Sequence, residues 1–412
     1  MNIKYSSKRK IFNDPIYGFV SIPFELVFDI IEHPFFQRLR RISQLGLTNL
    51  VYSGANHTRF QHTLGAMHLM TRAIEVLKSK GIAITEEESQ GAVLAILLHD
   101  IGHGPFSHTL EHSIVKGVSH EDLSALFMQE LNREFNGELE LAIDIFNNNY
   151  SKHFLHQLVS SQLDMDRLDY LKRDSFFTGV SEGVVGSERI IKMLHVQEDE
   201  LAIERKGIYS IEKFLVARRL MYWQVYLHKT VLSAEFLLTK ILSRAKELAS
   251  QGQELFASDA LAQFLYHEIN REDFIQQPDL LKLFALLDDY DIMGAIKVWS
   301  SHPDHILSQL CDRLVNRKLF KIQLQNEPFK PEVIEQKQNE VMQALGLHDH
   351  EVQYFVFSNA VTNSAYSEKI DGIKILYKDG SLKELQDDAD LINISALSKP
   401  VHKYFLCYPK LF

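Results

Sequence analysis

The amino-acid sequence predicts a mainly α-helical fold: a large helical bundle with a short N-terminal β-hairpin and a small α+β domain at the C-terminal end. Three observations in its 412 residues predict this fold. Positions 106–277 contain no proline, and because proline costs about 3 kcal/mol inside a helix, this stretch suits long helices. Apolar residues recur at steps of three or four in several segments. Runs of β-prone residues lie near the two ends of the chain.

The N-terminal hairpin is predicted over residues 11–22, where a loop containing Pro and Gly separates β-prone residues. An amphipathic helix is expected to begin at Arg59. Its periodic positions are Phe60, Leu64, Met67, Thr71, Ile74 and Leu77. The run Ala92–Leu98 is apolar on every side, which predicts a buried helix. Ile211–Leu248 has helical character over nearly its whole length.

The C-terminal part changes in character. Pro331 and Gly346 bracket one helix, because proline favours the first turn of a helix and glycine the position after its end. Three β-rich runs follow: Tyr354–Phe357, Ile373–Tyr377 and Tyr404–Tyr408. We therefore expect two domains, a helical one over residues 1–325 and a small α+β domain over residues 326–412.

Composition limits the functional classes. The formal net charge of −10 argues against a protein that coats DNA or RNA, since binding phosphate backbones needs clustered positive charge. A small phosphorylated ligand held by a few local arginines stays compatible with it. The two cysteines, Cys311 and Cys407, have no metal-like or disulfide spacing. Without a secretory signal or a membrane-length apolar run, we expect a soluble cytoplasmic protein.

Histidines and carboxylates gather directly after the buried apolar run. His99 and Asp100 stand where an unpaired charge would be costly. His103 is four residues beyond His99, so both imidazoles are predicted on one helix face. Beyond the helix-breaking Gly104-Pro105, the same region carries His108, Glu111, His112 and His120. A second His-Asp pair, His348-Asp349, lies in a polar stretch and is predicted to be a loop.

A second acidic group has helical spacing. Asp166, Tyr170 and Asp174 recur every four residues and share one face. Such a stripe is often a solvated surface, and scattered histidines are often surface residues. Together with His62 and the His99-Asp100 pair, however, Asp166 completes a mixed N/O set that suits iron, manganese or zinc better than calcium. Arg59, Arg167 and Arg218 supply positive charge for phosphate.

Four longer strings carry a family resemblance: FQRLRRISQLG from Phe36, HTRFQHTLG from His57, HDIGHGPFSH from His99 and DMDRLDY from Asp164. In this order they resemble the HD-domain metal-dependent phosphohydrolases. They are most similar to the branch that hydrolyses deoxynucleoside triphosphates (dNTPs), which includes bacterial dGTPase-like proteins and the animal SAM-and-HD-domain dNTPase. The resemblance spans roughly residues 10–245 and implies an HD-domain helical bundle.

The resemblance also implies a reaction and its residues. A dNTP would be hydrolysed to a deoxynucleoside and inorganic triphosphate, with Fe, Mn, Zn or Ni in the protein and Mg²⁺ possible with the substrate. The implied metal ligands are His62, His99, Asp100 and Asp166. The implied catalytic residues are His103, His108, Glu111 and His120. The implied substrate-binding residues are Gln44, Leu45, Arg59, Arg167, Tyr170, Asp174, Arg218 and Tyr226.

The resemblance also bears on regulation and specificity. Asn13, Glu32 and Arg40 match positions that contact a guanine nucleotide activator in the animal enzyme, which implies a homo-oligomer, a dimer or tetramer. Leu227 replaces a glutamine near the base, so the preferred base stays open. Two alternatives also stay open. One is another HD phosphoesterase, a 5′-nucleotidase or cyclic-nucleotide phosphodiesterase, and the other is a nucleotide-binding regulator without turnover.

Overall fold

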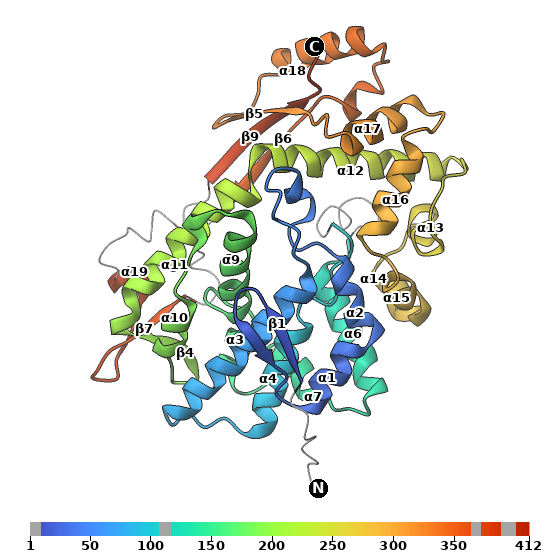
Figure 1. The fold of residues 1–412 in the computed structure, drawn as a ribbon. Coiled ribbons are helices and arrows are strands. Elements are labelled where there is room, and N and C mark those ends of the chain that lie inside the picture. Colours follow the sequence, from blue (N-terminus) through green and yellow to red (C-terminus); the bar gives the residue numbers. More distant parts are fainter. Residues whose placement is uncertain (1–9, 107–114, 116, 364–371, 389–400, 412) are drawn as a thin grey trace.

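The computed structural model describes residues 10–106, 115, 117–363, 372–388 and 401–411. His108, Glu111 and His112 lie outside these residues, so the predictions made for them stay predictions. Helices make up most of the described chain, with small sheets at its periphery (Figure 1). The predicted mainly α-helical class is confirmed.

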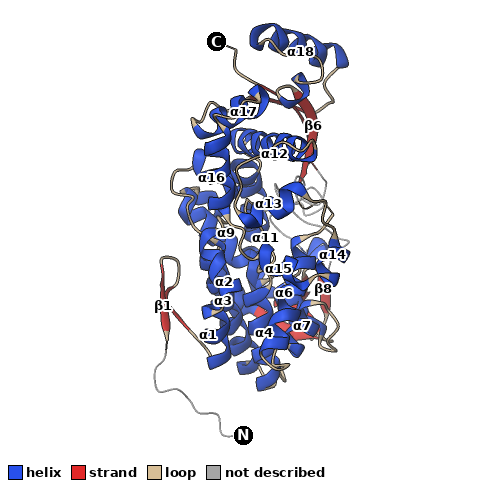
Figure 2. Cartoon of the chain, turned by 90° about the vertical axis from the view of Figure 1, so that its right-hand side faces the viewer, coloured by secondary structure: helices blue, strands red, loops and turns tan. Residues whose placement is uncertain are grey.

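The predicted hairpin is confirmed. Strands β1 (Ile11–Asp14) and β2 (Gly18–Ser21) pair antiparallel. The Asp14 carboxylate closes the turn, because its Oδ1 accepts hydrogen bonds from the backbone N–H groups of Ile16 and Tyr17 at 2.8 and 3.0 Å. The hairpin stands at one edge of the helical body (Figure 2).

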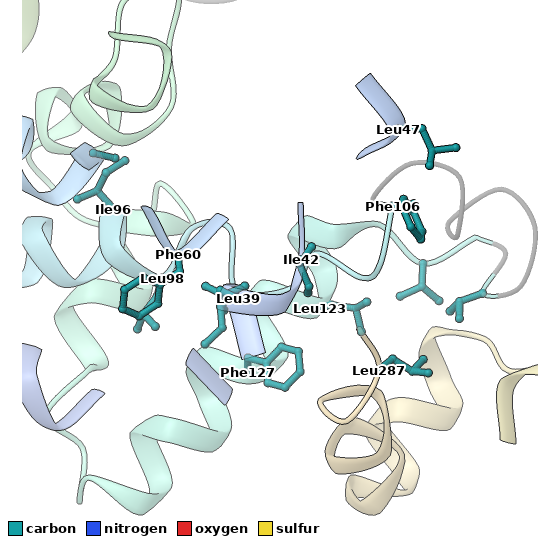
Figure 3. Close-up of a cluster of buried hydrophobic side chains, with 14 of the residues drawn as sticks. Leu39, Ile42, Leu47, Phe60, Ile96, Leu98, Phe106, Leu123, Phe127 and Leu287 are labelled. Atoms are coloured by element: carbon teal, nitrogen blue, oxygen red, sulfur yellow. The ribbon is translucent and has the colours of Figure 1, made fainter. Parts of the chain in front are cut away.

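The helices that follow form the central bundle. They are α1 (Glu25–Glu32), α2 (Pro34–Gln37), η1 (Arg38–Arg41), η2 (Gly46–Leu50), α3 (Arg59–Ser79), α4 (Glu86–Leu98), α6 (His120–Glu134), α7 (Glu140–Phe146), α8 (His153–Val159) and α9 (Met165–Thr178). Helix α3 begins at Arg59 as predicted, because Thr58 and Gln61 form a capping box there. The apolar run in α4 is fully buried. Figure 3 shows Leu39, Leu98 and Phe127 gathered in the core.

A second set of helices extends the bundle. It comprises η3 (Ser181–Gly183), α10 (Ser187–Met193), η4 (Arg205–Gly207), α11 (Ile208–Met221), η5 (Tyr222–Tyr226), α12 (Lys229–Ser250), α13 (Asp259–Tyr266), α14 (Arg271–Gln276), α15 (Pro278–Phe284), α16 (Asp289–Trp299) and α17 (His305–Val315). The predicted helical stretch 211–248 is therefore interrupted. Helix α11 passes into the π-helical turn η5, and α12 starts anew where the His228 side chain accepts from the N–H of Thr230.

Two further sheets contain the C-terminal strands. Strands β5 (Lys321–Gln325), β9 (Val401–Tyr408) and β6 (Phe357–Asn363) form one antiparallel sheet. Strands β3 (Leu194–Gln197), β4 (Glu200–Glu204), β7 (Lys374–Leu376) and β8 (Leu382–Glu384) form the other. The remaining elements are α18 (Pro331–Leu345), η6 (Val352–Tyr354) and α19 (Leu385–Asp388).

The C-terminal predictions have mixed outcomes. Helix α18 begins at Pro331 and is closed by Gly346 in the left-handed conformation, as predicted. The predicted strand over Tyr354–Phe357 is wrong. Val352–Tyr354 instead form the short helical turn η6, and strand β6 begins only at Phe357, the last residue of the predicted run.

Both C-terminal sheets cross the predicted domain boundary. β5, which precedes residue 326, pairs with β9, and β4 pairs in parallel with β7. The division at residue 325 stays a prediction, but the two parts share their sheets. Among the described residues, every helix is too short or too polar to cross a bilayer.

Candidate active site

Three helices bring two histidines and one aspartate together. His62 lies in the first turn of α3, His99 caps the C-terminal end of α4, and Asp166 lies in the first turn of α9. The Nε2 atoms of His62 and His99 lie 3.0 and 3.5 Å from Asp166 Oδ1. These three side chains offer ligand atoms that all lie within 4.8 Å of one another.

The other ring nitrogen of each histidine is already engaged. His62 Nδ1 lies 2.7 Å from Asp169 Oδ2, and His99 Nδ1 lies 2.6 Å from the carbonyl oxygen of Ile96. Both Nε2 atoms are buried and make no hydrogen bond of acceptable geometry to any described residue. Imidazoles oriented in this way by a second partner are typical metal ligands. The donor set therefore fits a first-row divalent metal.

The electrostatics of the cluster also favour a cation. Burial alone would lower the pKa of His62, but the carboxylates of Asp166 and Asp169 outweigh it and raise this pKa to about 10. The contacts with His62 and His99 hold the pKa of Asp166 well below its usual range, against the effect of burial. A site that favours positive charge so strongly on an imidazole would also favour a metal ion.

Asp100 adjoins this cluster but also has other partners. Its Oδ1 lies 3.3 Å from His99 Nε2, and its Oδ2 lies 3.8 Å from His62 Nε2. Arg59 donates to Oδ2, and His103 Nε2 lies 3.2 Å from Oδ1. Asp100 is thus close enough to reach a shared ion, and its role as a fourth ligand stays a proposal.

The predicted placement of His103 on the helix of His99 is wrong. Helix α4 ends at Leu98, and His103 lies beyond a turn at residues 100–102. The turn packs closely on α6, since a Cβ on Gly102 would lie 2.2 Å from the carbonyl oxygen of His120. The His103 ring instead stacks on the ring of His120 at 3.9 Å. Burial, together with the charge of Arg59, lowers the pKa of His103 well below its usual range, so its imidazole is neutral.

A cleft of about 760 Å³ opens beside the cluster. It is lined by His99, Asp100, Ser119, His120, Glu121, Asp122, Ala125, Phe146, Asn147, His156, Val159, Ser160, Asp166, Arg167 and Arg271. This volume lies within the range of small-ligand sites. His99 and Asp166 line this cleft, so two of the three side chains of the cluster face a space of small-ligand size, whereas His62 is fully buried.

Two predicted arginines lie on the α9 and α11 side of the site. Arg167 lines the cleft, with its Nε 3.4 Å from Asp164 Oδ2. Arg218 is buried on α11 and donates to Gln162 Oε1 at 3.2 Å. Burial raises the pKa of Tyr170 well above its usual value, although both guanidinium charges act in the opposite direction. Arg167, Arg218 and Tyr170 therefore share one electrostatic environment.

Asp174 is held from two sides. His57 Nε2 lies 2.7 Å from Asp174 Oδ1, and the Tyr226 hydroxyl donates to Oδ2 at 2.7 Å. His57 is itself fixed by stacking on the Phe177 ring at 4.5 Å. The predicted substrate residues Tyr226 and Asp174 thus form one hydrogen-bonded unit, and the ring of Tyr170 lies 6.2 Å from that of Tyr226.

Gln44 and Leu45 lie where the chain passes the start of α3. The Gln44 N–H donates to the carbonyl oxygen of His57, and the Arg59 N–H donates to that of Ile42. The side chains of Gln44 and Leu45 are half-buried, and Gln44 Oε1 has no hydrogen-bond partner among the described residues. Neither residue lines the cleft described above.

The three positions predicted to bind an activator lie on one exposed side of the molecule. Asn13, Glu32 and Arg40 are all exposed. Phe12, the residue before Asn13, packs edge-on against Phe60, and the Arg40 guanidinium lies 3.5 Å from the centre of the same ring. Glu32 acts electrostatically on Arg40, opposing the lowering of its pKa by burial.

Sequence reasoning missed four buried residues that support the site: Arg38, His57, Asp169 and Arg173. Arg38 is fully buried and donates to the backbone carbonyls of Ile101 and His103. Arg38, His57 and Asp169 lie inside the motif strings, so their positions were visible. Their partners become apparent only in three dimensions.

Comparison with known proteins identifies the family. The model of the HD domain matches residues 59–174, and that of the HD-associated region matches residues 185–270. A protein of Bacillus subtilis, named as uncharacterized, is 32% identical and covers 98% of this chain and 93% of its own length. This chain belongs to the HD-domain phosphohydrolase family. The matched HD domain contains His62, His99, Asp100 and Asp166.

Two other relatives carry informative names. A phosphohydrolase from Bacteroides thetaiotaomicron is 56% identical, covers 98% of this chain and all of its own, and superposes with a TM-score of 0.95. A deoxynucleoside triphosphate triphosphohydrolase SAMHD1 homologue from Dictyostelium discoideum is 29% identical over 68% of this chain and 58% of its own length. The resemblance of this HD-domain protein to the dNTP triphosphohydrolases is thereby confirmed.

Proposed function

We propose that this protein hydrolyses dNTPs to a deoxynucleoside and inorganic triphosphate. The observation that carries the proposal is the convergence of His62, His99 and Asp166 on one point beside a cleft of about 760 Å³. Arg167 lines the same cleft, so metal-binding donors and a phosphate-binding cation occupy one site. The named activity of the relatives supports a dNTP as substrate.

His62, His99 and Asp166, with Asp100 as a fourth ligand, would hold one divalent or transition metal. When bound, such a metal lowers the pKa of water to about 7 and neutralises phosphate charge. Asp100 has a second task in this proposal. Its carboxylate fixes Arg59 and His103 beside the metal, so the same residue orients a phosphate-binding cation and a neutral imidazole.

Side chains of the protein would neutralise the remaining phosphate charge and transfer the proton to the leaving group. Arg59, Arg167 and Arg218 would bind the triphosphate, because a guanidinium offers several donors to phosphate oxygens. The 5′-oxygen leaving group needs an acid. His120, at the cleft and stacked on His103, is one candidate, and the undescribed His108 with Glu111 is the other.

The sugar would be recognised by the unit around Asp174. Both carboxylate oxygens of Asp174 are engaged by His57 and Tyr226, so this acceptor and the Tyr226 ring are fixed before substrate binds. Gln44 and Leu45 would complete the sugar pocket. A pocket with no partner for a 2′-hydroxyl group disfavours ribonucleotides.

Product analysis in ¹⁸O-labelled water tests the reaction. Purified protein with Mn²⁺, Mg²⁺ or Fe²⁺ is incubated with each dNTP, and the products are identified by mass. We expect a deoxynucleoside and a triphosphate that carries one ¹⁸O. Labelled inorganic phosphate with a dNDP would indicate attack at the γ-phosphorus and contradict the proposal. Turnover of monophosphates or cyclic nucleotides alone would indicate another phosphoesterase, and binding without turnover would indicate a regulator.

A further inference from the structure

A buried chain of ionic contacts runs from the N-terminal hairpin to His62. Asp14, at the end of β1, accepts a hydrogen bond from Arg173 Nη1 at 2.8 Å. Arg173, on α9, also donates through Nε and Nη2 to the two oxygens of Asp169, at 2.9 and 3.0 Å. Asp169 Oδ2 lies 2.7 Å from His62 Nδ1. Four side chains from three elements are thus connected in series.

This series of ionic contacts is shielded from water along its length. Asp169, Arg173 and His62 have no exposed surface, and Asp14 is 8% exposed. Helix α3 passes so close that a Cβ on Gly65 would lie 2.0 Å from Asp169 Oδ1 and 2.2 Å from Arg173 Nη2. Because these side chains are shielded from solvent, water does not readily replace a missing partner.

Asp14 has two separate tasks in this arrangement. Its Oδ1 closes the hairpin turn, and its Oδ2 binds Arg173. Arg173 is a buried cation with two carboxylate partners, and removing one partner of a buried ion pair leaves charge uncompensated. A guanidinium that has lost Asp14 would shift relative to Asp169, which is the residue that orients the His62 ring.

We propose that Asp14 is a positioning residue for the metal centre, acting on His62 through Arg173 and Asp169. The inference rests on the proposed metal site. It makes the N-terminal hairpin, which precedes the matched HD domain, part of the metal-binding unit. Outer-shell partners of ligating histidines commonly govern metal affinity, and here the outermost partner comes from the hairpin.

The test is Mn²⁺ affinity of the metal-free full-length protein, measured by titration calorimetry. Asp14→Asn keeps an acceptor for the turn but presents an amide to Arg173, and Asp14→Ser keeps a short acceptor that cannot reach it. We expect Asp169→Asn to weaken Mn²⁺ binding by about 10–100-fold and both Asp14 variants by a smaller factor in the same direction. The absorption bands of the Co²⁺-loaded Asp14 variants should also shift, because the geometry around His62 changes.

The matched control is Asp304→Asn. Asp304 also caps a helix with one oxygen and binds a largely buried arginine, Arg244. This pair joins the start of α17 to α12 and lies outside the candidate site. This variant should lose stability and keep wild-type Mn²⁺ affinity and Co²⁺ spectrum.

Two results overturn the inference in distinguishable ways. Folded Asp14 variants with wild-type Mn²⁺ affinity and Co²⁺ spectrum would refute the role of Asp14 and leave the metal site intact. If the His62→Ala variant binds Mn²⁺ as tightly as the wild type does, the metal site and the inference are refuted together. If Asp14→Asn does not fold, the Mn²⁺ affinity and Co²⁺ spectrum of Asp14→Ser test the role of Asp14. The Co²⁺ spectrum of Asp169→Asn, compared with that of Asp304→Asn, then tests the link from Asp169 to His62.

Discussion

We expect Arg38→Met to lower dNTP hydrolysis in a protein that still folds, because Arg38 supports the turn that carries Asp100 and His103. Arg38 is fully buried, and its guanidinium packs against the neighbouring rings of Phe127 and Phe284, at 5.2 and 5.4 Å from their centres. Its guanidinium donates to the carbonyl oxygens of Ile101 at 2.6 Å and His103 at 2.9 Å. These two bonds hold the backbone on both sides of Gly102.

The magnitude follows from these contacts. Hydrogen bonds to a charged group contribute about 1.5–3 kcal/mol each, so the two bonds together contribute about 3–6 kcal/mol. Removing the buried guanidinium also removes its desolvation cost, which offsets part of this loss, and methionine refills much of the volume. We expect a net loss of about 1–3 kcal/mol in the free energy of unfolding. We also expect kcat/KM to fall about 10–100-fold, because the turn carrying Asp100 and His103 loses its support.

The assay pairs urea unfolding, followed by tryptophan fluorescence, with steady-state dNTP hydrolysis. Arg38→Lys should fall between wild type and Arg38→Met, because a single ammonium group does not match the fork of a guanidinium. Arg244→Met is the control, since Arg244 binds Asp304 and Glu247 away from the cleft and should affect only the unfolding midpoint. Wild-type kcat/KM in a folded Arg38→Met protein would refute the assigned role of Arg38.

Three further predictions concern the metal, the sugar and regulation. Metal analysis of purified protein should find one transition metal per chain in wild type and much less in Asp166→Ala and Asp100→Ala; undiminished metal in Asp100→Ala would remove Asp100 from the ligand set. The kcat/KM for dGTP should exceed that for GTP by about tenfold to a hundredfold, because an unpaired 2′-hydroxyl costs about 1–3 kcal/mol, and equal values would contradict the proposed sugar pocket. Turnover of dATP or dCTP and the mass measured by light scattering should rise together when GTP or dGTP is added. A Glu32→Ala variant that responds like wild type would exclude Glu32 from the activator site.

The sequence predicted the three side chains that lie together in the structure, because each belongs to a recognisable local pattern. His62 lies in the first turn of the helix predicted to begin at Arg59, Asp166 belongs to the predicted stripe of helical spacing, and His99 follows the predicted buried apolar run. The hairpin and helix α18 were equally predictable from their turn and capping residues. In each case a few adjacent residues specify the local conformation.

The failures share a different cause. The prediction that His103 continues the helix of His99 counted residues along a helix, but α4 ends at Leu98 and the chain then turns, with Gly102 packed closely against α6. Arg38 binds backbone carbonyls, which carry no residue identity that a sequence could reveal. Asp14 and Arg173 are separated by 159 positions, so only the folded chain brings them together.

These long-range contacts show that residues outside the matched HD domain hold the side chains of the site in place. The HD-domain match begins at residue 59, yet Arg38 and Asp14 both precede it. Arg38 holds the turn that follows His99, and Asp14 reaches His62 through Arg173 and Asp169. A histidine ligand needs its second nitrogen and its backbone held by partners that cannot move independently. Because those partners come from the segment before the HD domain, the residues that precede α3 belong to the same functional unit as the donors themselves.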